Sequence, residues 1–311
     1  MMIHKRPVFL LIALASVLLL ISACSPSISI PGGSSITVLQ LLQNSSSAMS
    51  KLKSAHIDVK ANGSGQALTS STATPTTNST PTTSDVTFGL TGSGDEALPN
   101  EEAMQFNVTQ NVTNTTSNLS QIVQGDKVYI KNTKGQWYVL DKSVLKNYVG
   151  NPFSGINNAD LSFLIGLLEH TKITDNGVES LNGQNLRHIT IALDQVALKQ
   201  FLSTNQQLLD ILGQQNLNAI LEHTKAFSST VDLWIDEATF YLHRTELKFN
   251  LSADTSTLGQ YLTPTINTVV VPSNITTNFD SVVDLSKFNE PVTITPPTNA
   301  IPTNDPTVVF G

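Results

Sequence analysis

The chain has 311 residues, of which 40% are hydrophobic and 13% are charged, a composition typical of a globular protein with a neutral, polar surface. Its formal net charge of −7 argues against nucleic acid as a partner and against electrostatic binding to anionic lipid. The only cysteine is Cys24, which excludes an intramolecular disulfide.

The N-terminal stretch has the layout of a secretory signal. Residues 4–6 form a short positive head, and residues 8–21 form an apolar run that is too short for a comfortable membrane span. The tetrapeptide Ile21-Ser22-Ala23-Cys24 resembles the bacterial lipobox, although that pattern prefers leucine in place of Ile21. The resemblance implies that residues 1–23 are removed and that a diacylglycerol on Cys24 anchors the protein at the extracytoplasmic face of the cell membrane. The alternatives are an ordinary secretory signal with an incidental cysteine and an uncleaved anchor helix.

Residues 24–35 are small, polar and interrupted by Pro and Gly, which predicts a flexible tether. Apolar residues then recur at helical spacing, which predicts an amphipathic helix over residues 36–53. Directly afterwards the period changes to two. In SAHIDVKAN, the residues Ile57, Val59 and Ala61 share one face, which predicts a half-buried strand.

Residues 69–84 are rich in Ser, Thr and Pro and contain almost nothing that can be buried, so we expect a disordered loop inserted between the first two strands. Alternation resumes around residues 86–90, 106–108 and 128–130. The sequence KNTKGQ predicts a turn, after which residues 137–141 (WYVLD) form the partner strand of a hairpin. The pattern is that of an antiparallel meander.

Two helical passages interrupt this meander. Residues 159–170 are apolar nearly all the way round, and residues 194–222 carry a long apolar pattern that Gly213 is expected to break. A helix that is apolar on all sides is covered on more than one side. If the sheet is curved, these two helices would therefore plug its concave face and leave an apolar cavity where they do not fill it.

Further strands lie between and after the helices. Short strands are predicted around residues 172–174, 178–181 and 186–193, and a second hairpin is predicted from residues 229–236 and 240–253. The tail from residue 288 onwards is punctuated by proline and should end the sheet as an edge strand or coil. The predicted fold class is therefore α+β, with one curved antiparallel sheet and its helices on one side.

Five stretches in order resemble the LolA/LolB-like lipoprotein-carrier superfamily, and most of all its mycobacterial LppX/LprG branch. They are spread over about residues 36–297, which is nearly the whole chain after the signal, and read LLQNSSSAMSKLKSAHIDVKANGSG, GDKVYIKNTKGQWYVLD, GVESLNGQNLRHITIALD, VDLWIDEATFYLHRTEL and FNEPVTITPP. The resemblance implies an unclosed β half-barrel with helices across its mouth, a closing strand at residues 288–297, and non-covalent carriage of lipid or acyl chains. Residues 298–311 would follow this domain as a tail. The insertion at 69–84 and the Gln/Asn-rich passage at 204–218 depart from the branch and leave the ligand open.

The candidate cavity residues come from one predicted strand and the two predicted helices. They are Phe88, Leu90, Phe163, Leu164, Leu167, Leu198, Phe201 and Leu202. Packing in a solid core is the alternative for each of them. Trp137 and Trp234 face the same choice, and we expect them to be buried anchors of the sheet and not part of a cavity rim.

A search for reactive chemistry finds little. The sequence LEHTK occurs at 168–172 and again at 221–225, and its His and Glu could suggest a metal site or an acid–base pair. Each copy follows an apolar helix, however, where His and Lys are favoured by the helix dipole. Alternation places His188 and His243 opposite the apolar positions, and no nucleophile, zinc or phosphate-loop motif is present. We therefore predict no enzymatic activity, no metal and no cofactor.

Two functions remain open. The first is a membrane-anchored lipoprotein that binds lipid or acyl chains in a hydrophobic cavity and carries them at the cell envelope. The second is an envelope sensor or adaptor with a solid core, which binds a protein or a cell-wall component through its surface. Detecting a bound lipid would separate the two.

Overall fold

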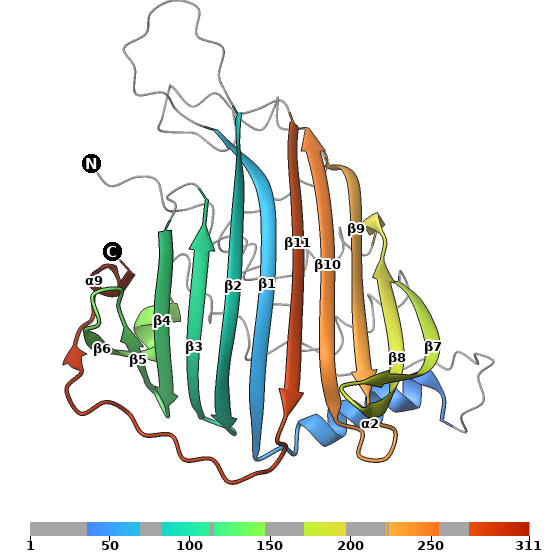
Figure 1. The fold of residues 1–311 in the computed structure, drawn as a ribbon, viewed down its shortest axis with the longest axis horizontal. Coiled ribbons are helices and arrows are strands. Elements are labelled where there is room, and N and C mark those ends of the chain that lie inside the picture. Colours follow the sequence, from blue (N-terminus) through green and yellow to red (C-terminus); the bar gives the residue numbers. More distant parts are fainter. Residues whose placement is uncertain are drawn as a thin grey trace, which may run out of the picture.

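The structure is a computed structural model that describes residues 36–68, 83–111, 115–146, 171–196, 222, 224–254 and 274–310. Within these ranges the chain forms one large sheet and three short helices (Figure 1). The helices are α2 (Val38–Met49), α3 (Lys142–Lys146) and α9 (Thr307–Phe310).

The sheet has 12 strands. Their bounds are β1 (Ser54–Leu68), β2 (Thr83–Ala97), β3 (Glu101–Gln110), β4 (Thr115–Gln124), β5 (Lys127–Lys131), β6 (Trp137–Asp141), β7 (Thr171–Leu181), β8 (Gln184–Leu193), β9 (Thr224–Ile235), β10 (Leu242–Asp254), β11 (Asn274–Ser286) and β12 (Ile301–Pro302).

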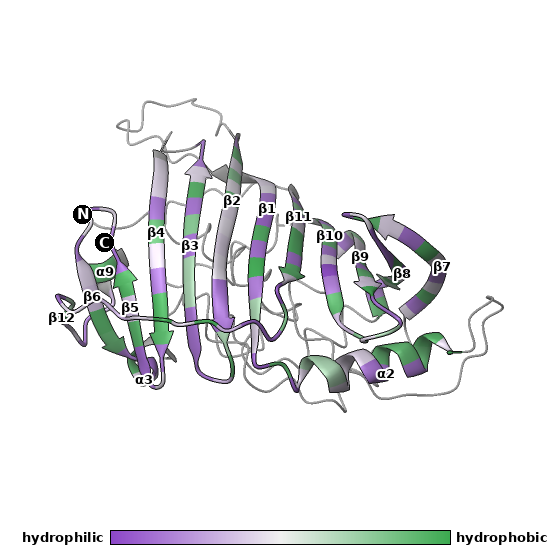
Figure 2. Ribbon diagram, turned by 60° about the horizontal axis from the view of Figure 1, so that its bottom comes forward, coloured by the Kyte–Doolittle hydropathy of each residue, from purple (hydrophilic) through white to green (hydrophobic). Residues whose placement is uncertain are grey.

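The strand order is β12-β6-β5-β4-β3-β2-β1-β11-β10-β9-β8-β7. Strands β1 to β6 form one meander and β7 to β10 another, and β11 joins them by pairing with β1 on one side and β10 on the other. All described pairs are antiparallel except β12 with β6, so the sheet is mixed and not purely antiparallel as predicted. Its two end strands are unpaired with each other, and Figure 2 shows the curvature, so the predicted unclosed, curved sheet is confirmed.

The predicted helix over 36–53 is confirmed as α2, which begins at a capping box. The Gln40 amide donates to Thr37 Oγ1 (3.2 Å), and the Thr37 amide donates to Gln40 Oε1 (3.1 Å). The buried residues Val38, Leu41 and Leu42 lie on one side of the helix. This helix lies across the ends of the β7–β10 half of the sheet (Figures 1 and 2).

Most predicted strands are present, with three differences. β4 and β11 were not predicted, and the two strands predicted around 172–174 and 178–181 are one strand, β7. A bulge between Asp175 and Gly177 shifts the register of β7, and Gly177 has a φ of +83°. Residues 290–297 are coil, so the closing strand implied by the resemblance at 288–297 is wrong. Its proline residues lack the amide hydrogen that a sheet ladder requires.

The two helical passages predicted over 159–170 and 194–222 lie almost wholly outside the described residues. None of 159–170 is described, and of 194–222 only 194–196 and 222 are. The predicted covering of the concave face by these helices therefore stays a prediction. Residues 1–35 and most of the insertion at 69–84 also lie outside the described ranges.

Candidate functional site

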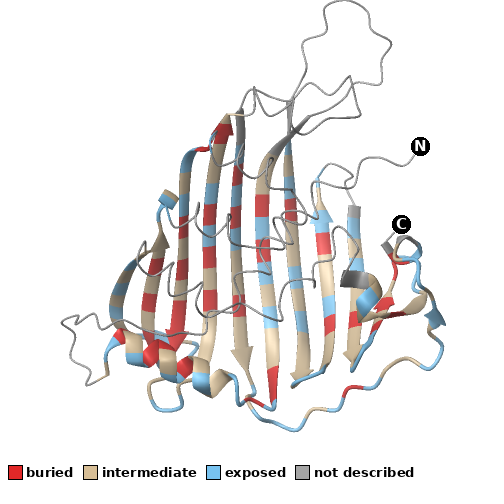
Figure 3. Cartoon of the chain, turned by 180° about the vertical axis from the view of Figure 1, so that it is seen from behind, coloured by how far each residue is buried: buried red, intermediate tan, exposed pale blue. Residues whose placement is uncertain are grey.

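The two faces of the sheet differ in chemistry because side chains alternate along every strand. Cross-strand pairing places Ala61, Phe88 and Phe279 on the same side of the sheet, and places Asn62, Thr109 and Asp280 on the other. We call the first side the apolar face and the second the polar face. Seen from the side on which α2 lies, buried residues recur along most of the strands (Figure 3).

The apolar face carries the main hydrophobic cluster. Its members come from α2 and from six neighbouring strands, and they are Val38, Leu41, Leu42, Ala61, Phe88, Ile189, Ile191, Val231, Leu233, Ile235, Leu247, Phe249 and Phe279. A second cluster of Val128, Ile130, Leu140 and Val309 lies toward the β6 edge. The two clusters therefore place hydrocarbon on the sheet from β8 to β2 and again on β5 and β6.

Two aromatic rings lie over glycines in the middle of this face. A Cβ on Gly63 would lie 2.0 Å from the Phe88 ring, and a Cβ on Gly92 would lie 2.5 Å from the Phe106 ring. Each ring thus occupies the space where the cross-strand neighbour has no side chain. Because the rings lie against the backbone of β1 and β2, they cover the sheet without standing high above it.

The structure places two of the predicted cavity residues on this face. Phe88 is 4% exposed, and Leu90 is partly buried against the same cluster. The other predicted residues (Phe163, Leu164, Leu167, Leu198, Phe201 and Leu202) and the lipidation site Cys24 lie outside the described residues.

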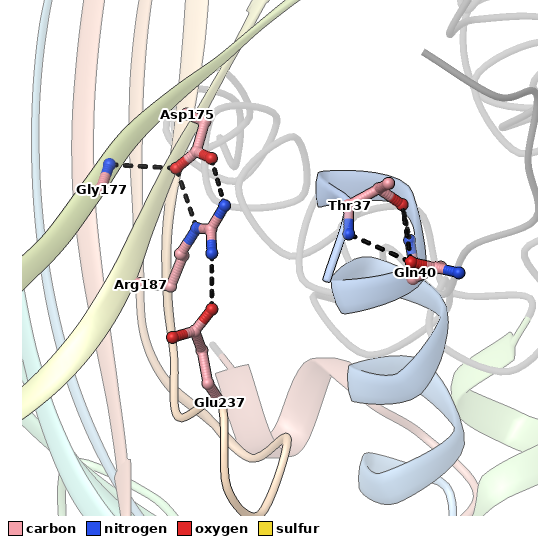
Figure 4. A network of polar contacts seen from close by, with 6 residues as sticks. All are labelled: Thr37, Gln40, Asp175, Gly177, Arg187 and Glu237. Carbon is pink, nitrogen blue, oxygen red and sulfur yellow. Dashed lines mark hydrogen bonds and ion pairs between the residues drawn. The ribbon is translucent and has the colours of Figure 1, made fainter. Parts of the chain in front are cut away.

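A buried ion pair lies at one end of the apolar face and was not predicted (Figure 4). Arg187 Nε donates to Asp175 Oδ1 (3.0 Å), a second guanidinium nitrogen bonds Asp175 Oδ2, and Nη1 donates to Glu237 Oε1 (2.5 Å). The side chains of Arg187 and Asp175 are each 5% exposed. The hydrogen bond from Arg187 holds the pKa of Asp175 below its usual value.

This pair fastens the edge strand β7 to β8 and to the turn after β9. The sequence contained a signal for it, because Arg187 is in phase with the apolar positions Ile189 and Ile191. A charged residue in phase with a buried face needs a buried partner.

Two carboxyl groups also lie on the apolar face, across from each other on β2 and β3. Glu96 pairs with Glu102 in the ladder, and Gln121 Nε2 donates to Glu102 Oε1 at 3.2 Å. Burial, and to a lesser extent the neighbouring Glu102, raises the pKa of Glu96 to about 7. Burial also raises the pKa of Glu102, although its hydrogen bond from Gln121 opposes the shift.

On the polar face, His188 stacks on Trp234 with ring centroids 4.2 Å apart and an interplanar angle of 11°. Its Nε2 lies 2.9 Å from Asp232 Oδ1, and its Nδ1 lies 3.0 Å from Glu179 Oε1 without the alignment of a hydrogen bond. Burial lowers the pKa of His188, but the two carboxylates outweigh burial and raise it above the usual value.

His188 is thus opposite the apolar positions, as predicted, but it is half-buried and not solvated. Trp234 is buried, as expected of a sheet anchor, and Trp137 is half-buried. No group of three or more His, Cys, Asp or Glu side chains suited to a metal occurs within the described ranges. No helix among the described residues is long and apolar enough to span a membrane.

Comparisons with known proteins return structural likenesses only. No protein-family model matches the chain, and no curated protein matches it. Among solved structures, the chain is similar to the lipoprotein LppX of Mycobacterium tuberculosis (16% identity, TM-score 0.40, covering 82% of this chain and 96% of that one). It is also similar to LprF of Mycobacterium bovis (16% identity, TM-score 0.39, 83% and 95%). A third match is a putative outer membrane lipoprotein-sorting protein domain from Vibrio parahaemolyticus (11% identity, TM-score 0.21, 76% and 87%).

These matches include LppX and a lipoprotein-sorting domain, which are the kinds of protein that the sequence motifs resemble. None of the likenesses reaches a TM-score of 0.5, so none carries an argument about function.

Proposed function

We propose that this chain is a lipoprotein of the cell envelope that binds lipid acyl chains non-covalently against the apolar face of its sheet and carries them, with no enzymatic step. Cys24 would anchor it to the extracytoplasmic face of the membrane. The predicted helices 159–170 and 194–222 would cover the concave face and gate access to it.

The observation that carries the proposal is the apolar face itself. Hydrocarbon side chains line a curved, unclosed sheet from β8 to β2 and again at β5 and β6. An acyl chain in a bilayer is already in hydrocarbon, so a carrier has only to offer an equally apolar surface; each methylene left in water would cost about 0.8 kcal/mol. At the centre of this surface, aromatic rings occupy the side-chain space of Gly63 and Gly92.

Native mass spectrometry tests the proposal directly. A Cys24→Ala variant without residues 1–23, purified without detergent, should carry lipid that dissociates on collisional activation. Extraction of the same sample should identify that lipid. Repeatedly lipid-free spectra, together with no uptake of a fluorescent fatty acid, would contradict the carrier and favour the envelope adaptor.

A matched pair of variants locates the site. Leu90 and Thr91 are neighbours on β2, but Leu90 lies on the apolar face and Thr91 is exposed on the polar face. In the same background, Leu90→Asp should lower fatty-acid uptake at least about tenfold, because a charge in hydrocarbon disfavours the ligand by more than 1.4 kcal/mol. Thr91→Asp should leave uptake unchanged.

Circular dichroism must show both variants folded. If Leu90→Asp unfolds, Leu90→Trp takes its place, since it keeps the position apolar but fills the space above it, with Thr91→Trp as its control. If the position 90 variant and its position 91 control are both folded and take up the fatty acid equally, any lipid binds at a place other than Leu90.

A further inference from the structure

The polar face of the sheet carries a hollow of about 400 Å³. It crosses four neighbouring strands, β3, β2, β1 and β11. Its lining residues are Asn62, Gly63, Ser64, Thr87, Phe88, Gly89, Thr109, Asn278 and Asp280. Because the side chains of Asn62, Ser64, Thr87, Thr109, Asn278 and Asp280 all belong to the polar face, this hollow is separate from the apolar face.

The hollow exists because one position in a cross-strand row has no side chain. The row runs Thr109, Gly89, Asn62, Asp280 across the four strands. A Cβ on Gly89 would lie 2.8 Å from Thr109 Oγ1 and 3.6 Å from Asn62 Oδ1, so even a small side chain would intrude there. Glycine weakens a strand interior. At position 89 it leaves the backbone of β2 uncovered between the polar side chains of the neighbouring strands.

The polar groups around Gly89 make few and long hydrogen bonds with one another. Among the described residues, the Asn62 amide and the Asp280 carboxylate form no hydrogen bond or ion pair. The remaining contacts are long: Thr109 Oγ1 donates to the Gly89 carbonyl at 3.4 Å, and Asn278 Nδ2 donates to Ser64 Oγ at 3.4 Å. These donors and acceptors are therefore free to exchange water for a ligand at little cost.

The lining chemistry selects the class of ligand. Among the described residues that line the hollow there is no Lys, Arg or His, which disfavours phosphates and other anions, and their one carboxylate is too few for a divalent cation. The side chains directed to this face are hydroxyls, amides and a carboxylate, which disfavours an acyl chain. Hydroxyl and amide groups that both donate and accept, with one carboxylate able to accept from two adjacent hydroxyls, match a polyhydroxylated ligand.

We propose that this hollow is a binding site for a short stretch of a neutral glycan. Its volume lies within the range of about 300 to 1,000 Å³ found for small-molecule sites. The site is open and polar, so its affinity should be weak. The proposal is independent of lipid binding, which concerns the opposite face.

Saturation-transfer difference NMR on the full-length chain tests this site. The protein is kept in a zwitterionic detergent, because sugar-headed detergents would compete, and the probes are chitotetraose and maltotetraose. At least one tetrasaccharide should bind saturably, and tetraethylene glycol should not. Gly89→Val, which fills the hollow with a residue suited to a strand, should weaken binding at least about tenfold.

Two further variants show whether Gly89→Val weakens binding by filling the hollow or by disturbing the fold. Gly65→Val makes the same change on the apolar face, where a Cβ would meet only ordinary contacts, 3.5 Å from the nearest atom, and it should bind as the parent does. Asn62→Ala with Asp280→Ala removes hydrogen-bonding groups without adding bulk and should also weaken binding at least about tenfold. The proposal fails if neither tetrasaccharide binds saturably, or if folded Gly89→Val binds as tightly as the parent. Fatty-acid uptake by Gly89→Val should be unchanged, so the two functions can fail separately.

Discussion

At the scale of single residues, the apolar face holds ionisable groups in two different ways. Arg187 and Asp175 are buried as a bidentate pair, which keeps both charged and ties the edge strand down. Glu96 and Glu102 instead face each other across two strands, and burial raises the pKa of both, with repulsion from Glu102 adding to the shift of Glu96. The first pair is suited to holding structure, and the second makes the face sensitive to pH.

The raised pKa of Glu96 predicts a pH dependence of stability. Its folded value of about 7 lies above the ordinary value of 4.5, so the folded state binds the proton more tightly than the unfolded chain does. The stabilisation is complete below pH 4.5 and is lost as the pH rises through 7. Glu96→Gln removes this dependence. At pH 8 its free energy of unfolding should exceed that of the parent by about 2 to 3 kcal/mol, and this difference should vanish near pH 4.5.

Urea denaturation at pH 4.5, 6, 7 and 8 measures the effect for the parent and the variant. A stability difference that is the same at all four pH values would show that Glu96 ionises normally in the folded protein.

At the scale of elements, the contact between β1 and β2 depends on a small residue opposite a large one. The Phe88 ring occupies the space beside Gly63, and the Phe279 ring from β11 stacks near it with centroids 6.0 Å apart. Three central strands thus share one aromatic contact. Adding side-chain volume at Gly63 must displace the Phe88 ring, because the three heavy atoms nearest to a Cβ there all belong to that ring.

Gly63→Val should therefore destabilise the protein by about 1 to 3 kcal/mol, although valine suits a strand better than glycine does. Gly65→Val lies two residues along the same strand and on the same face, where a Cβ meets only ordinary contacts, and should change stability by less than about 1 kcal/mol. Thermal unfolding of the two variants measures the difference. Equal unfolding temperatures would mean that the Phe88 ring moves freely.

The same elements show what the sequence could predict. Strict alternation identified β1, the β5–β6 hairpin and the β9–β10 hairpin, because one face of each is apolar. β4 (TTSNLSQIVQ) and β11 (NITTNFDSVVDLS) escaped, since their apolar-face positions include Ser117, Gln121, Thr277 and Ser281 and so break the alternation. The alternation placed Phe88 and Leu90 on one strand face, as the register shows. It also put Arg187 in phase with Ile189 and Ile191, but it did not reveal the bulge in β7 next to Asp175.

At the scale of the whole molecule, the sheet is two meanders joined by a strand from near the end of the chain. β11 lies between β1 and β10, and Ser54 Oγ donates to the carbonyl of Glu290, 236 residues away, at 2.5 Å. The curved apolar face is continuous only because this strand closes the gap. Its pairing is strongly non-local, so the centre of the sheet should form late in folding.

Two truncations of the chain test this dependence. Ending the chain at Pro297 removes β12 and α9, and with α9 it removes Val309 from the cluster near β6. This loss should cost about 1.5 to 3 kcal/mol and should increase hydrogen exchange in β5 and β6, while the amides of β1 and β10 remain protected.

Ending the chain at residue 273 removes β11 and leaves β1 and β10 as two unpaired edges. The two meanders then have no hydrogen-bonded connection within the described sheet, so both should lose protection and the cooperative unfolding transition should disappear. Hydrogen exchange followed by mass spectrometry, with urea unfolding, distinguishes the two truncations. If β10 stayed fully protected without residues 274–311, each meander would be stable alone. The apolar face would then consist of two independently stable surfaces, and β11 would not be needed to form either.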